Sequence, residues 1–254
     1  MNILTINAED WYNGFIPAED KDWNRLEYRV DKMLVPMLDE LDKHHMRAVV
    51  FCTGWLAEKH PEMVREIARR GHSIGCNGYW HIEPLTMSVE EFREDTKKAK
   101  EILEEVSGQK VKAFRAANFS MDEERLGVLA ELGFQYDSSL FGSEPYRVSD
   151  GFKGVQKGSG DSESLMEYPV AKYKGKIPFS GGGFFRLMPY WLIRKALKEM
   201  PYVMTYFHPR DFDKDQPLWP GIGAKDKFLS TVGVASGFKK WQKLLNEFKF
   251  ETIY

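Results

Sequence analysis

Residues 48–76, AVVFCTGWLAEKHPEMVREIARRGHSIGC, decide the fold, because an apolar run is followed by an amphipathic segment and then by a second apolar run. The runs at 48–52 and 73–76 are short and apolar, as is typical of buried strands. Pro61 can occupy the first turn of a helix, and Gly71 stands just past the point where that helix would end. The stretch therefore predicts a strand, a helix and a second strand parallel to the first.

The same alternation extends in both directions along the chain. Apolar runs predict further strands at residues 3–6, 111–114, 134–136, 202–207 and 248–253. Helical spacing and capping signals predict helices at about 30–41, 89–108, 122–132, from 189 onward, and at 236–247 with Ser236 as its cap. The signal is strongest at Ser88 and Glu91, which form a capping box for the helix that ends at Gly108.

Residues 142–188 interrupt this rhythm, and we expect them to form an insertion in a single domain, residues 1–254. The insertion should contain a β-like excursion at about 165–179 and a close turn at the glycines 181–183, with no helix directly after them. About seven βα units in one domain predict either a barrel or an open doubly wound sheet. Because polar residues follow many strands rather than one switch point, the pattern favours a distorted barrel.

Composition excludes several classes of function. The 254 residues are 43% hydrophobic and 29% charged, which is ordinary for a globular protein. The net charge of −2 argues against nucleic acid as a partner. No apolar stretch approaches the roughly 20 residues that cross a bilayer, and the first residues lack the pattern of a signal peptide, so we expect no integral membrane segment and a cytoplasmic location. Cys52 and Cys76 lie in apolar runs and are expected to be buried, reduced thiols.

Polar side chains follow most of the predicted strands, and these are Glu9 and Asp10, His81, Arg115, Asp137 and His208. Glu9 and Asp10 fit two alternatives equally well: a metal-ligand or acid/base pair, and an acidic loop that caps helices. His81 fits a metal ligand or a structural histidine, and Arg115 fits a cation that orients a carboxylate or a structural ion pair. His208 stands where it could donate a proton to a leaving group.

Several motifs, in order, resemble those of the polysaccharide deacetylases with the NodB homology fold, of the carbohydrate esterase 4 type. The resemblance is strongest to the branch associated with exopolysaccharide synthesis. Residues 4–11 resemble its D-[VI]-E-[DE]-W motif, residues 115–117 its R-A-P, and residues 136–139 its Y-D-S-S. Further matches are 181–187 (GGGFFRL), 207–209 (FHP) and 215–217 (DQP). The resemblance covers nearly the whole chain and implies a single-domain distorted (β/α)7 barrel.

The resemblance also implies a metal centre and a substrate. It implies a divalent metal, most often zinc, held by Glu9, Asp10 and His81 together with position 77. The metal would polarise an N-acetyl carbonyl and activate a water. The substrate would be an N-acetylated saccharide, which could be free, lipid-linked or nucleotide-linked.

Four further residues receive roles from the same resemblance. A backbone amide near Asn118 would stabilise the oxyanion that forms after water attacks. His208 would protonate the departing amine. Arg115 would hold the acidic group of the first motif, and Asp137 would orient a neighbouring side chain.

The chain departs from the family pattern at its reaction centre. Asn7 stands where the motif carries the Asp that serves as general base, and Asn77 stands where it has the first His of an H-x-x-x-H metal pair. A side-chain amide can hold a water but does not take its proton, and losing a general base costs about 10² to 10⁴ in rate. Asn77 offers only a weak carbonyl ligand to zinc. Ala117, in place of the Pro of R-A-P, is a milder change.

Three interpretations of these departures remain open. The chain is a deacetylase with a remodelled site and reduced or altered activity, or a catalytically inactive carbohydrate-binding pseudoenzyme, or an active enzyme into which one or both asparagines were introduced. Five aromatic residues are expected at the rim of the site, where they either stack on sugar rings or pack the rim, namely Trp11, Tyr12, Trp80, Tyr146 and Phe185.

Overall fold

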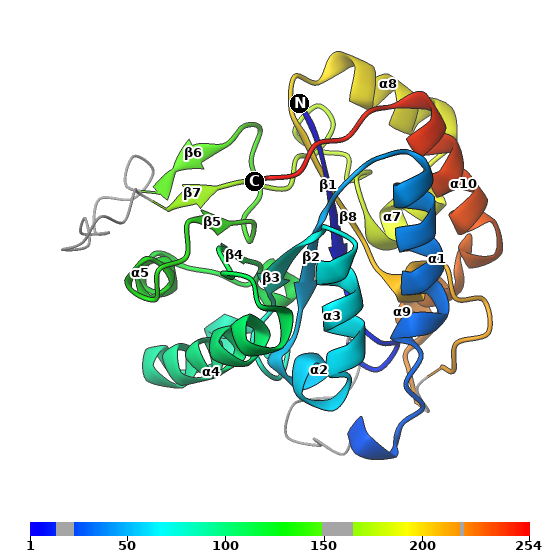
Figure 1. The fold of residues 1–254 in the computed structure, drawn as a ribbon. Coiled ribbons are helices and arrows are strands. Elements are labelled where there is room, and N and C mark those ends of the chain that lie inside the picture. Colours follow the sequence, from blue (N-terminus) through cyan, green and yellow to red (C-terminus); the bar gives the residue numbers. More distant parts are fainter. Residues whose placement is uncertain (14–22, 149–164, 219–220) are drawn as a thin grey trace. The chain divides into compact units, whose positions relative to one another are not determined.

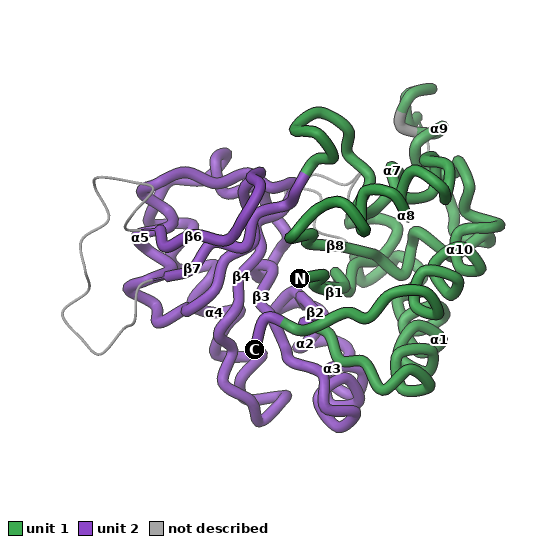
Figure 2. The backbone as a smooth tube through the Cα atoms, turned by 90° about the horizontal axis from the view of Figure 1, so that it is seen from above, with its two compact units in different colours: residues 1–48, 172–252 green, residues 49–171, 253–254 purple. Residues whose placement is uncertain are grey.

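The computed structural model describes residues 1–13, 23–148, 165–218 and 221–254, so residues 149–164 of the expected insertion lie outside the described residues. The chain divides into two compact units, which are coloured separately in Figure 2. Unit 1 comprises residues 1–48 and 172–252, and unit 2 comprises residues 49–171 and 253–254.

Unit 1 is built on two parallel strands, β1 (Asn2–Asn7) and β8 (Val203–Phe207), whose register pairs Ile6 with Phe207. Its helices are α1 (Val30–Lys43), α7 (Gly182–Leu187), α8 (Tyr190–Glu199), α9 (Ala224–Thr231) and α10 (Val234–Glu247), with short 3₁₀ turns η2 (Trp23–Arg25) and η5 (Pro209–Asp211). Figure 1 shows α1, α7, α8 and α10 gathered on one side of the strand pair. The apolar stripe of α1 and the side chains of β1 are buried there, as their periodicity predicts.

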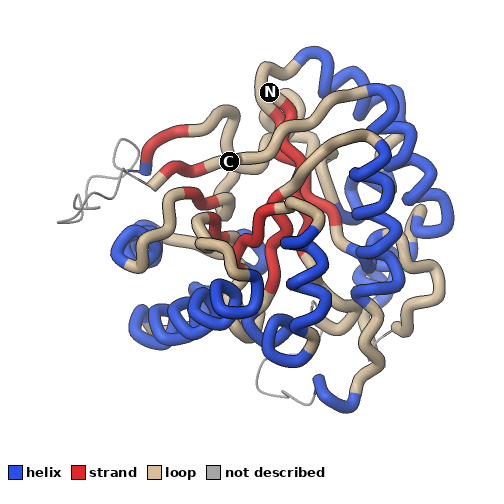
Figure 3. The backbone as a smooth tube through the Cα atoms, viewed as in Figure 1, coloured by secondary structure: helices blue, strands red, loops and turns tan. Residues whose placement is uncertain are grey.

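Unit 2 contains a second run of parallel strands, in the order β7 (Met166–Glu167), β5 (Tyr136–Asp137), β4 (Ala113–Phe114), β3 (Ser73–Cys76) and β2 (Val49–Cys52). A short strand β6 (Tyr146–Arg147) adds antiparallel to β7. The helices, blue in Figure 3, are α2 (Gly54–Lys59), α3 (Pro61–Arg69), α4 (Val89–Ser107) and α5 (Glu123–Glu131), with 3₁₀ turns η3 (Pro84–Thr86) and η4 (Ala117–Phe119).

The expected strand–helix–strand unit at 48–76 is confirmed as β2, α3 and β3. The capping box at Ser88 is also confirmed, because its side chain accepts from the Glu91 backbone while the Glu91 carboxylate accepts from the Ser88 backbone. Gly108 ends α4 in the left-handed conformation, at φ +69°. None of the described helices combines the length and apolarity that a membrane span requires.

Two expectations at the carboxyl end of the chain are wrong. Helix α10 begins at Val234 rather than after Ser236, because Gly233 adopts a left-handed conformation and serves as the N-cap. The expected strand at 248–253 is a single bridge in which Glu251 pairs with Ile3. Among the described residues, no strand pairing with β1 continues beyond Glu251, and the chain ends in unit 2, where the Tyr254 ring stacks on that of Tyr136.

The glycine triplet is also followed by a helix, contrary to expectation, since α7 begins at Gly182. A side chain at Gly181 would place its Cβ 2.0 Å from the carbonyl oxygen of Tyr206, so only glycine permits this close approach to β8. Gly182 has φ +54°, and a Cβ atom added to it would lie 3.9 Å from the Cε1 atom of His208. The triplet thus lets the chain pass close to the end of β8. Helix α2, capped by Thr53, and helix α9 were not expected either.

Candidate active site

The carboxyl ends of β1 and β8 bring Asn7 and His208 together in unit 1. Because Ile6 pairs with Phe207, the next residue of each strand emerges at the same edge. The Asn7 Nδ2 atom lies 3.4 Å from the His208 Nε2 atom, and both side chains are buried. Two residues 201 positions apart in the chain therefore face one another, as the strand-end pattern predicts.

Glu9 lies beside them with N–H donors on both carboxylate oxygens. Asn7 Nδ2 donates to Oε1 at 2.9 Å, and Arg210 Nη2 donates to Oε2 at 2.7 Å. His208 Nε2 lies 3.7 Å from Oε2. Since Glu9 is only 2% exposed, its charge needs such compensation, and the amide of Asn7 must present its nitrogen rather than its oxygen to the carboxylate.

Asp211 orients the His208 ring from the other side. Its Oδ2 atom accepts the backbone N–H of His208 at 2.9 Å and lies 2.8 Å from Nδ1. Burial raises the pKa of Asp211, but the charge and hydrogen bond of His208, with the charges of Arg186 and Arg210, outweigh it and hold the pKa below its usual value. An ionised Asp211 selects the tautomer that carries a proton on Nδ1, which leaves Nε2 directed at Asn7 and Glu9.

Asp10 has a separate, structural environment. Its Oδ1 accepts from the backbone N–H of Trp11 at 2.8 Å, and its Oδ2 accepts from that of Arg29, at the start of α1, at 2.7 Å. Burial raises the pKa of Asp10 to about 6, although these backbone hydrogen bonds and the charge of Arg29 oppose the rise. The alternative in which the acidic loop caps a helix therefore describes the contacts of Asp10.

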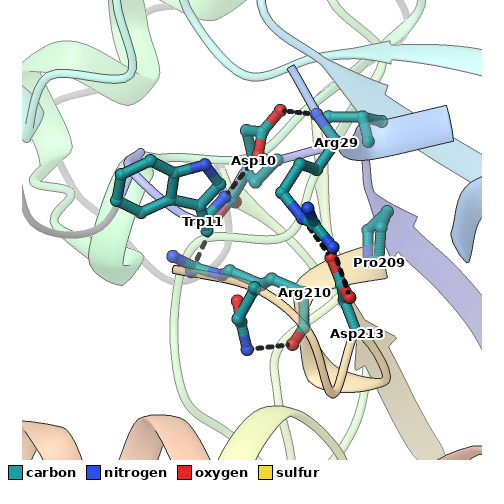
Figure 4. A pocket seen from close by; sticks show the side chains of 9 residues that line it. Asp10, Trp11, Arg29, Pro209, Arg210 and Asp213 are labelled. Atoms are coloured by element: carbon teal, nitrogen blue, oxygen red, sulfur yellow. Dashed lines mark hydrogen bonds and ion pairs between the residues drawn. The ribbon is translucent and has the colours of Figure 1, made fainter. Parts of the chain in front are cut away.

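Arg29 links this loop to the segment after β8. Its Nε and Nη2 atoms donate to the two oxygens of Asp213 at 2.7 and 3.0 Å, and the paired groups face one another in Figure 4. A small pocket lies among these residues and is lined in addition by Glu9, Trp11 and Arg210. Because the contact is bidentate, this ion pair holds the segment before α1 against the loop that follows β8.

In unit 2, Arg115 and Asp137 belong to one buried network. Arg115 donates from Nε to the Ser138 carbonyl at 3.1 Å and from Nη2 to the Ser138 hydroxyl at 2.8 Å. The Ser139 hydroxyl donates to Asp137 Oδ1 at 2.7 Å and accepts the N–H of Ala116 at 2.8 Å. Burial raises the pKa of Asp137, against opposing hydrogen bonds from Glu167 and Ser139 and the charge of Arg115. The loop after β4 is therefore tied to the segment after β5.

The other predicted residues of unit 2 follow β3 and β4. Asn77 is 2% exposed, and His81 follows it in the same loop with φ 55°. Asn118 has φ 52°, and its Nδ2 donates to Glu83 Oε1 at 2.7 Å. The loop after β3 is held by Asp95 of α4, whose carboxylate accepts the backbone N–H groups that follow Gly78, including that of Trp80 at 3.4 Å. Positive φ values are rare outside glycine and are often found at functional loops.

The predicted site residues thus divide between the units. Asn7, Glu9, Asp10, Trp11 and His208 belong to unit 1, and Asn77, Trp80, His81, Arg115, Asn118 and Asp137 belong to unit 2. Within unit 1, Asn7, Glu9 and His208 form one cluster and Asp10 stands apart from it in its contacts. Within unit 2, Arg115 and Asp137 share one network.

Three of the five aromatic residues expected at an exposed rim are buried. Trp11 is 6% exposed and donates from Nε1 to the Glu27 carbonyl, and its ring meets that of Tyr12 edge to face. Tyr12 and Phe185 are each 1% exposed, with Phe185 packed on Phe207. These three rings therefore lie in the packed interior of unit 1 rather than at an exposed rim.

The described residues do not fit the zinc site that the resemblance implies. No group of three or more His, Cys, Asp or Glu side chains within the described ranges is arranged to hold a metal ion. Both oxygens of Glu9 and both oxygens of Asp10 already accept from N–H donors.

Sequence reasoning missed several residues of these networks, among them Arg210, Asp211 and Glu167. Arg210 and Asp211 stand directly after the His-Pro of the FHP motif, so their nearness to His208 was available from the chain order. Glu167, which lies beside Asp137, follows it by thirty residues in a two-residue strand, and no periodicity marks so short an element.

Known proteins match the chain in sequence and in structure. Residues 28–136 match the polysaccharide deacetylase family model, and residues 144–254 match a domain of unknown function, DUF3473. A peptidoglycan-N-acetylglucosamine deacetylase of Bacillus cereus is 34% identical over 98 residues, which are 39% of this chain and 36% of that protein. The match thus spans about a third of that relative's length.

Two solved structures share the fold. A candidate polysaccharide deacetylase from Mycobacterium smegmatis superposes with a TM-score of 0.69 and 23% identity over 97% of this chain and 82% of that chain. A carbohydrate esterase 4 family pseudoenzyme from Bacillus anthracis gives a TM-score of 0.54 and 16% identity over 99% of this chain and 62% of that chain. These likenesses confirm the expected α/β fold class, that of the NodB-type (β/α)7 barrels.

Proposed function

We propose that the chain acts as a member of the polysaccharide deacetylase family, whose model matches residues 28–136, and that it binds an N-acetylated saccharide while its hydrolysis of the N-acetyl group is reduced or lost. The observation that carries this proposal is the hydrogen bond from Asn7 Nδ2 to Glu9 Oε1. In the family pattern that the chain resembles, a carboxylate at position 7 takes a proton from water, whereas the amide of Asn7 does not ionise near neutral pH.

The neighbouring acids are poor substitutes for the missing base. Both oxygens of Glu9 already accept hydrogen bonds, from Asn7 and Arg210, and Asp211 is engaged by His208. Loss of a general base costs about 10² to 10⁴ in rate, so we expect acetate release at least about a hundredfold below that of a family member that has the base.

The sugar ligand is proposed from the family. The Bacillus cereus relative is named for its action on N-acetylglucosamine in peptidoglycan, which supports an N-acetylated hexosamine as the group bound. A free oligosaccharide, a lipid-linked sugar and a nucleotide-linked sugar share this group. The Bacillus anthracis protein that shares the fold is a pseudoenzyme, and a mutant of it has restored enzymatic activity, so this fold is compatible with loss of hydrolysis.

The His208–Asp211 pair favours a second candidate function, a slow hydrolase. With Nδ1 bound to Asp211 at 2.8 Å, the Nε2 lone pair of His208 could take a proton from a water held by Asn7, and Asp211 would stabilise the imidazolium. His208 would then return the proton to the departing amine. This route requires no carboxylate base.

Calorimetric titration with an N-acetylated chito-oligosaccharide, combined with an acetate-release assay, separates these candidates. Binding without acetate release supports the first candidate. Acetate release that is lost in His208→Gln, while sugar affinity is kept, supports the second. Absence of both binding and release overturns the proposed function.

A further inference from the structure

Two buried acids of unit 2 face each other across adjacent strands. Asp137 ends β5, Glu167 ends β7, and the parallel register pairs these two residues. Both side chains are fully buried. One oxygen of each carboxyl has a donor, since Ser139 Oγ donates to Asp137 Oδ1 at 2.7 Å and the Leu140 N–H donates to Glu167 Oε1 at 3.0 Å.

The second oxygen of each carboxyl group is buried without a hydrogen-bond donor in the described part of the chain. Asp137 Oδ2 and Glu167 Oε2 are buried and have no donor among the described residues. Two ionised carboxylates in this position would repel one another and leave two lone-pair regions unsatisfied. One proton held between the two carboxyls satisfies both oxygens at once, as in other buried carboxyl pairs.

The surrounding charges favour one proton rather than two or none. Arg115 from the end of β4 supplies one positive charge to Asp137. Tyr146 of β6, which pairs with Glu167, stays neutral, because burial and the two acids raise its pKa to about 12. One cation therefore balances one anion.

The two acids differ in which carries the proton. Burial, followed by the charge of Asp137 and a hydrogen bond to it, raises the pKa of Glu167 well above its usual value. Burial also raises the pKa of Asp137, but its hydrogen bonds with Glu167 and Ser139 and the charge of Arg115 oppose the rise. These directions assign the proton to Glu167 and the negative charge to Asp137.

We infer that Asp137 and Glu167 share one proton at neutral pH, and that this acid pair positions the loop at residues 115–118 through Ser139. The ionised Asp137 holds the Ser139 hydroxyl, which in turn holds the N–H of Ala116. The protonated Glu167 occupies the other oxygen of Asp137 and so fixes the direction of its carboxylate. Glu167 is a positioning residue, and its effect on sugar binding rests on the proposed function.

Infrared spectroscopy of the whole protein tests the shared proton directly. A protonated buried carboxyl gives a carbonyl stretching band that ionised carboxylates lack, and we expect this band at pH 7. It should disappear in Glu167→Gln and persist in Glu105→Gln, a matched change at an exposed position of α4. Absence of the band from the unmodified protein at pH 7, or its persistence in Glu167→Gln, overturns the inference.

Sugar binding tests the positioning role. Glu167→Gln keeps an N–H donor for Asp137 and should leave the affinity for chito-oligosaccharide within about threefold, whereas Glu167→Leu should weaken it about tenfold. Affinity of the unmodified protein should fall as alkaline pH removes the shared proton, and that of Glu167→Gln should not follow this decline. Equal affinity in all three proteins overturns the positioning role. If no protein binds sugar, the proposed function fails, and the infrared band alone decides whether the proton is shared.

Discussion

Replacing Asn7 by aspartate should make the stability of the protein depend on pH. The new carboxylate would stand against Glu9 Oε1, which now accepts from Asn7 Nδ2 at 2.9 Å. Two like charges about 3 Å apart repel by about 5 kcal/mol at an effective dielectric constant of about 20. His208 and Arg210 offset part of this repulsion, so we expect a net loss of about 3 kcal/mol in the free energy of unfolding at pH 8.

The penalty should shrink in acid. The folded Asn7→Asp variant relieves the repulsion by taking up a proton that the unfolded chain, with ordinary carboxyl groups, binds only below about pH 4. The folded state then holds more protons than the unfolded state, so stability falls as pH rises. We expect the difference from the unmodified protein to be about 2 kcal/mol larger at pH 8 than at pH 5.

Urea unfolding at these two pH values, in chelator-containing buffer, measures the effect. Asn246→Asp, at an exposed position of α10, is the matched control and should change stability by less than about 0.5 kcal/mol at either pH. An Asn7→Asp penalty that is absent, or that is equal at pH 5 and pH 8, would show that no second charge meets Glu9 at this position.

Three further predictions concern packing and burial. Arg29→Met should lower the free energy of unfolding by about 3 kcal/mol in urea titration, because it leaves the buried Asp213 without its bidentate partner; an effect below about 1 kcal/mol would contradict this. Gly181→Ala should lower the free energy of unfolding by about 3 kcal/mol, because the added Cβ would clash with the carbonyl oxygen of Tyr206. The control Gly127→Ala, which has open space in α5, should raise the free energy of unfolding by up to about 1 kcal/mol. Similar melting temperatures for the two variants would show that Gly181 does not approach Tyr206 this closely. Both cysteine thiols should resist Ellman's reagent until urea unfolds the protein, because burial raises the pKa of each thiol; rapid labelling of the native protein would contradict their burial.

The fold was largely predictable because its signals are local. The apolar runs of β2 and β3, the Ser88 capping box and the glycine that ends α4 each specify an element within a few residues. The start of α10 was less predictable, because a left-handed Gly233 took precedence over Ser236 as the cap. The final strand failed for a tertiary reason, since Tyr254 packs on Tyr136.

The sequence predicts which residues follow the strands of the candidate site, but it does not predict the contacts that their side chains make. Parallel strands bring Asn7 and His208 to one edge, so their proximity follows from topology. The partners of Glu9 depend on how the chain turns after β8, which directs Arg210 at the carboxylate, and no sequence pattern specifies that direction. Glu167 could not be predicted for a related reason, because its contact with Asp137 depends on the register of a two-residue strand.

If Asn7 and Asn77 are what reduces hydrolysis, as we propose, the residues of the family pattern at these two positions should restore it. The most direct measurement is acetate release from an N-acetylated chito-oligosaccharide, with zinc content by mass spectrometry, for the unmodified chain and for the double variant Asn7→Asp, Asn77→His. We expect the unmodified chain to hold far less than one equivalent of zinc and to release almost no acetate, and the double variant to gain zinc and at least about a hundredfold in rate. Stoichiometric zinc and rapid turnover in the unmodified chain would contradict the proposed loss of hydrolysis.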